Sequence, residues 1–241
     1  MSRVDVLGLP VDVLTEEDLI DAVAERIEAG GKHTVAYLNV HVANLAAKDP
    51  ALTRFLQSVD ICYCDGEGIR LGAKLLGESL PERITGADWI WKLAEQAEGR
   101  WKIAWIGGEP GVTHQAAAIL QAKHPNLDIH CDHGFYRNDR YPQVIEALNE
   151  AKPHVLLVGM GSPLQEQWVA HWRDQVDAPV VWCLGATADF VSGKVSRGPA
   201  FLHNRQEWIA RLLVDPKRLW SRYLLGNTRF LGRVVKAKTR R

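Results

Sequence analysis

The chain has 241 residues, of which 46% are hydrophobic and 24% are charged, with 29 basic and 29 acidic side chains. This length and composition predict a soluble globular protein with one sizeable hydrophobic core. They exclude a membrane-spanning protein, because no apolar run approaches the roughly 18–20 residues that a bilayer requires. The first residues also lack the long apolar segment of a signal peptide.

The balanced net charge conceals an uneven distribution along the chain. Residues 197–241 carry 12 of the 29 basic side chains and only two of the 29 acidic ones. The tail therefore has a net charge of about +10 and the remaining chain about −10. Such asymmetry predicts an anionic partner for the tail.

The four cysteines indicate reduced thiols in a cytosolic protein. Cys62, Cys64, Cys131 and Cys183 form no C-x-x-C pair, and the first two lie too close together for a disulfide framework. We therefore expect neither disulfides nor a zinc site.

The first half of the chain predicts short strands and helices. Thr15 and Asp18 have the spacing of a helix capping box, and Gly30-Gly31 ends that helix. In chain order we expect a strand or hairpin over 3–14, a helix over 16–29, a strand over 34–38, a helix over 41–57 interrupted near Pro50, a strand over 59–62, a helix starting at 65–68, and a helix that carries Trp89, Ile90 and Leu93.

The second half alternates more clearly. We expect strands over 102–106, 127–130, 155–158 and 179–183. Helices are expected after the glycine turn at 107–111 and up to about residue 123, over 141–151, and from Ser162 onward. A loop is expected over 185–189. This alternation predicts an α/β fold with a mainly parallel sheet covered on both faces. Ligands bind such sheets at the carboxyl ends of the strands, where the pattern places Asn39, Asp65, Gly107, Gly159 and Asp189.

The stretch Val155–Trp168 predicts an anion site. A buried strand ends in Gly159-Met160-Gly161, and Ser162 and Pro163 suit the N-cap and first position of a helix. Gln165 and Glu166 would then lie in the first helical turn, at the mouth of the site. Backbone amides at such a turn can bind a diphosphate. The alternative is an ordinary strand-to-helix junction.

A second glycine turn, containing Gly107, Gly108 and Gly111, also follows a strand and opens a helix. It could approach a nucleotide, but it is not the G-x-G-x-x-G fingerprint, and no acidic residue at the end of the following strand is assigned. The alternative is a purely structural turn. His130, Asp132 and His133 resemble a metal cluster superficially and are interpreted as loop residues.

Asp65 is the strongest candidate for a catalytic residue. It precedes a predicted helix, where an anion is favoured and an ionised carboxylate can accept a proton. The alternative is that Asp65 is simply the N-cap of that helix. Arg83, in a loop, could bind a phosphate or carboxylate, or could simply be solvated.

Residues 197–241 predict basic amphipathic helices. Apolar stripes with helical spacing occur at Trp208, Ile209, Leu212 and Leu213, at Leu219, Trp220, Tyr223 and Leu224, and at Phe230, Leu231, Val234 and Val235, with Lys and Arg among them. Helices of this kind commonly lie in a membrane interface, so we expect the tail to bind an anionic membrane surface. The alternative is a terminal helical pair docked on the acidic body.

Taken in order, the motifs resemble those of the WecG/TagA/CpsF glycosyltransferase family. They are Asn39, Asp65-Gly66 with Gly68, Arg83-Ile84-Thr85-Gly86-Ala87-Asp88, Gly107-Gly108 with Gly111-Val112, His133-Gly134-Phe135-Tyr136, Gly159 to Glu166, Gly185 with Asp189-Phe190 and Gly193, Arg197-Gly198-Pro199, Glu207-Trp208 with Arg211-Leu212, and Pro216 with Arg218. The resemblance spans about residues 3–232, and it is the ordered set of motifs that is specific.

The resemblance implies an inverting transfer of a sugar from a UDP-sugar to a polyprenyl-diphosphate-linked saccharide, in the synthesis of bacterial surface polysaccharides. It implies a Rossmann-like core, residues 1–196, and a membrane-associating appendage, residues 197–241, that helps complete the active site. The expected location is the cytoplasm, peripheral on the inner face of the plasma membrane. No cofactor, metal or nucleic acid is expected, and self-association into a homo-oligomer is left open.

The resemblance also implies roles for individual residues. Asp65 matches the proposed catalytic base. Substrate-pocket positions are matched by Asn39, Arg83, Gln165 and Asp189, and diphosphate-facing arginines by Arg211, Arg218 and Arg222. We expect the amides of Gly107, Gly108, Gly111, Gly159 and Gly161, together with Glu166, to complete the substrate site.

Three positions depart from the family pattern. Tyr37 stands where members often have Thr, Leu164 replaces the Lys of P-K-Q-E, and Gly198 replaces the Ala of R-A-P. The first two leave the donor sugar open among N-acetylmannosamine, its uronic acid and glucose. Two other interpretations are retained: a nicotinamide-dependent oxidoreductase, from the fold, and a non-catalytic peripheral membrane module, from the tail.

Overall fold

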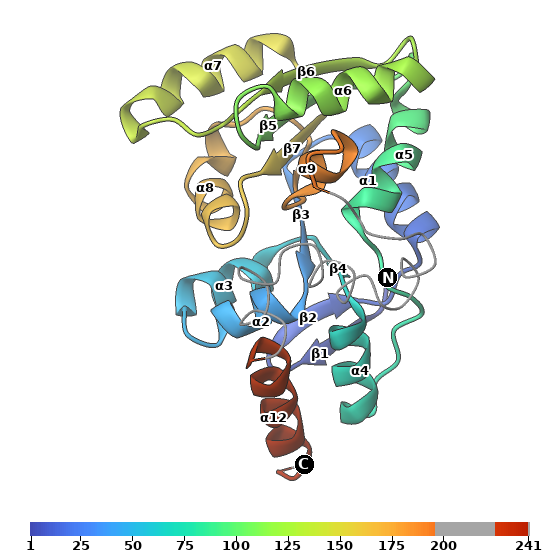
Figure 1. The fold of residues 1–241 in the computed structure, drawn as a ribbon, viewed down its shortest axis with the longest axis vertical. Coiled ribbons are helices and arrows are strands. Elements are labelled where there is room, and N and C mark those ends of the chain that lie inside the picture. The colour runs from blue at the N-terminus through green and yellow to red at the C-terminus, as the bar shows by residue number, and fades with distance from the viewer. Residues whose placement is uncertain (196–224, 241) are drawn as a thin grey trace.

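The structure is a computed structural model that describes residues 1–195 and 225–240 (Figure 1). Its centre is a parallel six-stranded sheet in the order β4-β3-β8-β7-β5-β6. The strands are β3 (His33–Leu38), β4 (Ile61–Cys64), β5 (Lys102–Gly107), β6 (Asp128–Asp132), β7 (Val155–Gly159) and β8 (Val180–Cys183). The predicted α/β class with a mainly parallel, Rossmann-like sheet is confirmed.

Helices cover both faces of this sheet. In chain order they are α1 (Glu16–Ala29), α2 (Val40–Ala46), α3 (Pro50–Ser58), α4 (Glu67–Leu76), α5 (Gly86–Ala97), α6 (Val112–Lys123), α7 (Tyr141–Ala151), α8 (Leu164–Trp172), α9 (Thr187–Val191) and α12 (Gly226–Lys238). Figure 1 shows α1, α5 and α6 along one side of the sheet and α3, α7 and α8 along the other. Two short 3₁₀ helices lie at Asn138–Arg140 and Arg173–Gln175.

An antiparallel hairpin precedes the sheet, as predicted for residues 3–14. Its strands are β1 (Arg3–Val6) and β2 (Leu9–Asp12), and β2 packs against β4. The Asp12 carboxylate is buried and accepts hydrogen bonds from the Arg3 guanidinium at 2.7 and 2.8 Å and from the Cys62 N–H at 2.7 Å. A buried carboxylate is tolerated when it is paired in this way, so the hairpin is fixed to the sheet.

The core of the sheet is rich in aromatic side chains. The rings of Trp89 on α5 and Trp182 on β8 stack with centroids 3.8 Å apart, and Tyr63 on β4 accepts a hydrogen bond from Trp89 Nε1 at 3.3 Å. All three side chains are fully buried. These three side chains join β4, β8 and α5 and so help to hold the ends of the two strands in place.

Several predicted boundaries shift. The interrupted helix over 41–57 is two helices, because Asp49 caps α3 and Pro50 occupies its first position. The strand expected over 59–62 lies at 61–64. The expected loop over 185–189 contains the start of α9, so Asp189 is helical.

Helix α8 starts at Leu164, and its N-cap is Pro163, not Ser162. The Ser162-Pro163 peptide bond is cis. The Ser162 hydroxyl donates to Glu166 Oε1 at 2.6 Å, and no side-chain hydrogen bond caps the helix.

The last helix, α12, docks on the body of the protein against α2 and α4 (Figure 1). Phe230 and Val234 are fully buried there. A Cβ atom on Gly72 of α4 would lie 2.7 Å from the Phe230 ring, so only glycine allows this close approach. Arg233 donates to the Ala43 carbonyl at 3.1 Å and to Asn44 Oδ1 at 2.7 Å.

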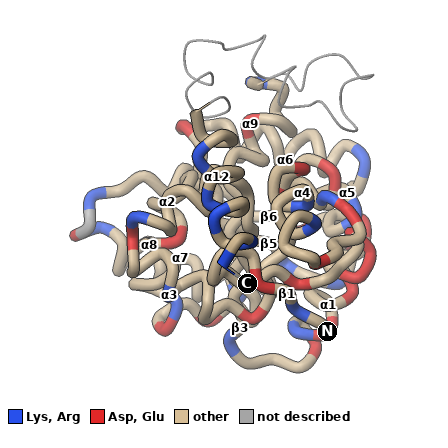
Figure 2. The backbone as a smooth tube through the Cα atoms, turned by 90° about the horizontal axis from the view of Figure 1, so that it is seen from below, with Lys and Arg blue, Asp and Glu red and all other residues tan. Residues whose placement is uncertain are grey.

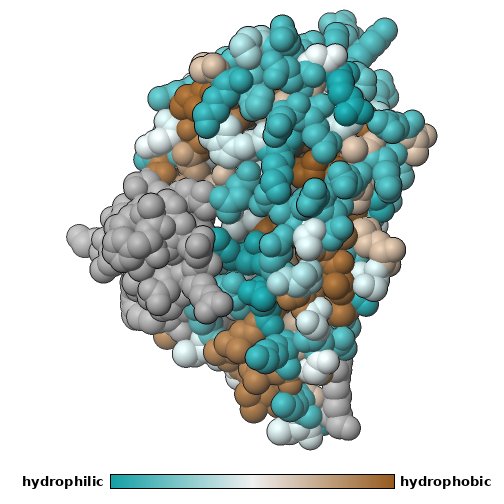
Figure 3. All heavy atoms as spheres, turned by 90° about the vertical axis from the view of Figure 1, so that its right-hand side faces the viewer, coloured by the Kyte–Doolittle hydropathy of each residue, from teal (hydrophilic) through white to brown (hydrophobic). Residues whose placement is uncertain are grey.

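Part of the apolar stripe predicted for the tail therefore faces the body. Val235 is still 55% exposed on α12, as is Leu71, at 47%, on α4. Figure 3 shows hydrophobic side chains gathered at the lower end of the molecule, at the height of α4 and α12 in Figure 1. Figure 2 shows Lys and Arg along α12 and Asp and Glu toward α1 and α5, consistent with the uneven charge distribution. No helix in residues 1–195 and 225–240 is long and apolar enough to span a bilayer.

Candidate active site at the carboxyl ends of the strands

Asn39 and Asp65 lie side by side at one edge of the sheet. β3 and β4 are parallel neighbours with Leu38 opposite Cys64, so the residue after each strand emerges at the same level. Asn39 Nδ2 donates to Asp65 Oδ2 at 3.0 Å, and Asn39 Oδ1 accepts from the Val42 N–H at 3.0 Å. Asn39 is thus the N-cap of α2, and capping fixes the orientation of the amide that holds the carboxylate.

Asp65 is not a helix cap. The N-cap of α4 is Gly66, whose φ of +117° is available to glycine and strained for other residues. The structural alternative for Asp65 is therefore wrong. Asp65 is half-buried and its carboxylate is oriented by Asn39, which suits a group that exchanges a proton with a bound ligand.

Arg83 lies in the loop between α4 and α5, beside this pair. The next residue, Ile84, donates its N–H to the carbonyl of Cys64, the last residue of β4, at 2.8 Å. This bond fixes the loop to the strand end, next to Asp65. Arg83 is half-buried, and the prediction that it belongs to the same site as Asp65 is consistent with this placement.

Gln165 and Glu166 are not at the mouth of a site. They are 0% and 2% exposed and form a buried cluster with Tyr37, Ser162 and Gly185, which we call the polar hub. Gln165 Oε1 accepts from the Gly185 N–H at 3.0 Å, and Gln165 Nε2 donates to Tyr37 Oη at 3.3 Å and to Glu166 Oε1 at 2.8 Å. Tyr37 Oη lies 3.2 Å from Ser162 Oγ. Gln165 thereby connects the ends of β3, β7 and β8.

The Glu166 carboxyl is unusual within the polar hub. Its Oε1 accepts from Ser162 and Gln165, whereas its Oε2 is buried and finds no hydrogen-bond partner among the described residues. Burial raises the pKa of Glu166 above its ordinary value, although the hydrogen bonds from Ser162 and Gln165 oppose this. Through the bond from Ser162, Glu166 holds the turn after β7 in place.

The glycine turns after β5 and β7 pack against each other. A Cβ atom on Gly107 would lie 2.3 Å from the Gly159 carbonyl oxygen, and one on Gly159 would lie 2.9 Å from the Gly185 oxygen. Gly108 N–H donates to the Gly159 carbonyl at 3.1 Å. These glycines are required by backbone packing alone. By contrast, a Cβ atom on Gly111 or Gly161 would meet no described atom within 4 Å, so these two positions leave open space at the strand ends.

Lys194 connects Asp189 to the first glycine turn through ion pairs that the sequence did not predict. Lys194 Nζ lies 2.8 Å from Glu109 Oε1 and 3.6 Å from Asp189 Oδ1. Its hydrogen bond to Glu109 and the charge of Asp189 raise the pKa of Lys194. The pair joins the β5–α6 turn to the segment after α9, across the strand ends. No spacing signal in the sequence connects Glu109 to Lys194.

The remaining predicted residues fall outside this group. Arg211, Arg218 and Arg222 lie outside the described residues. His130 and Asp132 lie in the edge strand β6, so only His133 of this trio is a loop residue, and its Nε2 is 3.9 Å from Asp132 Oδ1. Within the described part of the chain, no group of three His, Cys, Asp or Glu side chains could hold a metal ion.

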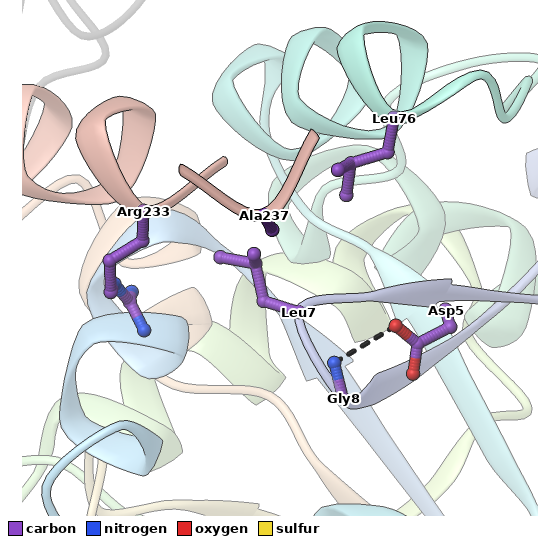
Figure 4. A pocket seen from close by; sticks show the side chains of 6 residues that line it. All are labelled: Asp5, Leu7, Gly8, Leu76, Arg233 and Ala237. Carbon is purple, nitrogen blue, oxygen red and sulfur yellow. Dashed lines mark hydrogen bonds between the residues drawn. The ribbon is translucent and has the colours of Figure 1, made fainter. Parts of the chain in front are cut away.

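A separate cavity of about 410 Å³ lies between the β1–β2 turn, α4 and α12, lined by Asp5, Leu7, Gly8, Leu76, Arg233 and Ala237 (Figure 4). Leu76 ends α4 and Asp65 precedes its first turn, so roughly 15 Å of helix separates the cavity from Asp65. Its polar groups have partners: Asp5 Oδ1 accepts from Gly8 N–H at 2.9 Å, and Arg233 bonds to α2. This cavity is not part of the candidate active site.

Fold and geometry together define an α/β protein with its site at the carboxyl ends of a parallel sheet, where a partly exposed carboxylate follows β4 next to an arginine loop and glycine turns follow β5 and β7. Residues 4–241 match the glycosyl transferase WecG/TagA/CpsF family. The chain belongs to this family, and its activity class is glycosyl transfer.

Curated relatives agree with this assignment. The N-acetylglucosaminyldiphosphoundecaprenol N-acetyl-beta-D-mannosaminyltransferases of Staphylococcus aureus strains NCTC 8325 / PS 47, COL and MRSA252 are each 25% identical to this chain over 241 residues. Each comparison covers 98% of this chain and 94% of the relative. The similarity therefore extends over nearly the whole length of both proteins.

Proposed function

We propose that this protein transfers a sugar from a UDP-sugar to a saccharide carried on a polyprenyl diphosphate, in the synthesis of a bacterial surface polysaccharide. The acceptor part rests on the relatives, whose names specify an N-acetylglucosaminyl-diphosphoundecaprenol acceptor. The observation that carries the proposal within this chain is the Asn39–Asp65 pair, an oriented and partly exposed carboxylate at the strand ends. The donor sugar class that we favour is an N-acetylhexosamine, by similarity to the same relatives.

In the proposed mechanism Asp65 accepts the proton of the acceptor hydroxyl as its oxygen attacks the anomeric carbon of the donor. The bond from that carbon to the diphosphate breaks, and UDP leaves with the bonding electrons. One direct displacement inverts the anomeric configuration. Asn39 keeps the Asp65 carboxylate aimed at the acceptor, and amides of the open turns at Gly111 and Gly161 and the Arg83 side chain stabilise the leaving diphosphate.

We further propose that residues 197–241 bring the enzyme to the inner face of the plasma membrane. The support is their positive charge, since each Lys or Arg near an anionic lipid surface contributes up to about 1 kcal/mol. On α12 the exposed Val235 lies next to Lys236, with Lys238 in the same turn. Arg211, Arg218 and Arg222 would then face the acceptor diphosphate.

The test is a transfer assay with the purified full-length chain, a lipid-linked N-acetylglucosaminyl diphosphate acceptor and a panel of UDP-sugars. We expect mass spectrometry to detect an acceptor that has gained one sugar, and UDP to be released in equal amount. No transfer from any UDP-sugar, together with binding of a nicotinamide dinucleotide, would overturn the proposal in favour of an oxidoreductase. Liposome co-sedimentation tests the membrane part separately: we expect binding to anionic vesicles and loss of binding when salt is raised.

A further inference from the structure

The connection from α4 to α5 carries Arg83 but has no regular secondary structure of its own. It comprises residues 78–85, and Figure 1 shows it as a long connection between the two helices. A loop of this kind presents a side chain at a fixed place only where contacts to the rest of the protein hold its backbone. Such contacts lie on both sides of Arg83.

Arg70 on α4 holds the part of this loop that precedes Arg83. Its Nη2 donates to the Pro81 carbonyl at 3.1 Å, and its Nε donates to the Leu80 carbonyl at 3.4 Å. The Leu80 side chain is buried in the hydrophobic core, which anchors the same point of the loop a second time. The backbone two and three residues before Arg83 is therefore tied to α4.

The third nitrogen of the Arg70 guanidinium connects the loop to the helical turn that follows Asp65. Arg70 Nη1 donates to both carboxylate oxygens of Glu67, at 2.9 and 3.1 Å. Glu67 is the first residue of α4, two residues after Asp65. The side chains of Arg70 and Glu67 are 34% and 37% exposed, so the pair is partly shielded from solvent. Because the guanidinium is a planar, rigid fork, one side chain fixes the loop and the start of α4 relative to each other.

The loop is also held at both residues that flank Arg83. Glu82 Oε1 accepts a hydrogen bond from the Glu16 N–H at the start of α1. The Ile84 N–H donates to the carbonyl of Cys64, the last residue of β4, at 2.8 Å. Neither of these two contacts involves α4, so the guanidinium on α4 adds a separate attachment, to the helix that follows the proposed catalytic carboxylate.

We propose that Arg70 is a positioning residue that holds Arg83 at a fixed place relative to Asp65. The inference rests on the proposed function, in which Arg83 stabilises the leaving diphosphate and Asp65 accepts the proton of the acceptor. Each of the three guanidinium nitrogens of Arg70 donates to the protein itself, so Arg70 acts through Arg83 and not by contact with a substrate. Stabilisation of developing charge depends on groups that are already in place before the reaction, and Arg70 supplies that order.

The experiment is a double-mutant cycle in the transfer assay, with the full-length chain, UDP-N-acetylmannosamine as donor and the lipid-linked acceptor. Arg83→Ala should lower kcat/KM for the donor by about 100-fold. Arg70→Ala alone should lower it by about 10- to 100-fold, because a misplacement of about 1 Å has an effect of this size. In the Arg83→Ala background, Arg70→Ala should lower kcat/KM by less than about twofold, because no group is left to position. A residue that only stabilised the fold would act by the same factor in both backgrounds.

Two further variants complete the test. Lys74→Ala is the matched control, since Lys74 is an exposed basic residue one turn further along α4; it should keep the wild-type kcat/KM. Arg70→Lys keeps the positive charge but not the planar fork, so kcat/KM should fall nearly as far as with Arg70→Ala. This variant takes the place of Arg70→Ala in the cycle if Arg70→Ala does not fold.

Equal factors for the Arg70 substitution in both backgrounds, or wild-type kinetics of Arg70→Lys, would overturn the positioning role. An Arg83→Ala variant with normal kcat/KM, or a wild type that transfers no sugar from any UDP-sugar of the panel, would instead count against the proposed function itself.

Discussion

The Asn39–Asp65 pair and the polar hub occupy neighbouring strand ends, yet they use polar side chains in opposite ways. Asp65 is half-buried and accepts a hydrogen bond from Asn39. Gln165 and Glu166 are buried and bond to three strand-end segments. Both regions carry motif residues of the family, so sequence motifs alone do not separate a group that can do chemistry from a group that positions the backbone.

Burial is the physical property that separates the two. A fully buried polar side chain must be satisfied by the protein, because an unpartnered group costs about 1–3 kcal/mol. A partly exposed carboxylate can exchange partners with water and ligand at low cost. We therefore assign chemistry to Asp65 and positioning to Gln165 and Glu166, and the variants below test that division from the largest expected effect to the smallest.

Asp65→Asn should have the largest effect, and on activity alone. Loss of a general base lowers turnover by about 10²–10⁴-fold. The stability of the folded state should change little, because Asn39 still caps α2. Steady-state transfer kinetics and a urea unfolding curve measure the two quantities. A folded variant with near-normal turnover would remove Asp65 from the base role.

Phe230→Ala should mainly weaken the docking of α12 on the helices that follow Asn39 and Asp65. Truncating a fully buried Phe costs about 3 kcal/mol in a packed site, and here it empties the notch above Gly72. The rate of amide hydrogen exchange in residues 226–238 should rise by the factor that corresponds to this loss of about 3 kcal/mol. Val235→Ala, at an exposed position of the same helix, is the control. It should change the free energy of opening that exchange reports by less than about 0.5 kcal/mol. Equal effects from both variants would contradict the observed docking.

Gln165→Ala should destabilise the whole fold by about 2 kcal/mol. The substitution removes two buried hydrogen bonds, one from the Gly185 N–H and one to the Tyr37 hydroxyl. Chemical denaturation measures this directly. Gln167→Ala, at an exposed position two residues along α8, is the matched control and should be neutral within about 0.5 kcal/mol. A stable Gln165→Ala variant with lost substrate binding would reverse our division and make Gln165 a ligand residue.

Glu166→Gln should have the smallest effect, and one that depends on pH. Because burial raises the pKa of Glu166 from 4.5, the folded state retains a proton that the unfolded chain has already released. The free energy of unfolding of the wild type should therefore fall as pH rises above 4.5, by about 1.4 kcal/mol per pH unit, and level off above the raised pKa.

Glu166→Gln removes this titration, so its stability relative to the wild type should improve from pH 4 to neutral pH, with the amide oxygen accepting from Ser162 and Gln165. Urea unfolding at a series of pH values is the measurement. Glu146→Gln, on the exposed side of α7, controls for general charge effects. If the free energy of unfolding varied with pH in the same way for the wild type and Glu166→Gln, the pKa of Glu166 would be the same in the folded and unfolded states, and the prediction would be wrong.

Local signals in the sequence determined most of the secondary structure and the fold class. The capping box at Thr15 and the glycines that follow the helix predicted both ends of α1 to the residue, and the alternation of strands and helices predicted the parallel sheet. The pattern also placed Asn39 directly after β3, whereas β4 ends two residues later than expected, directly before Asp65. These features depend on short-range periodicity and capping, which a sequence states directly.

Only the tertiary structure decided which of the motif residues are buried and which side chains they contact. Nothing near Gln165 in sequence indicates that its amide meets Tyr37 and Gly185, because burial at a strand end depends on which strands are neighbours. Asp132 shows the same limit: its place beside the glycine turn depends on the pairing of β5 with β6. The sequence by itself determined the elements and the family, and strand order, which is set by long-range packing, decided which side chains meet.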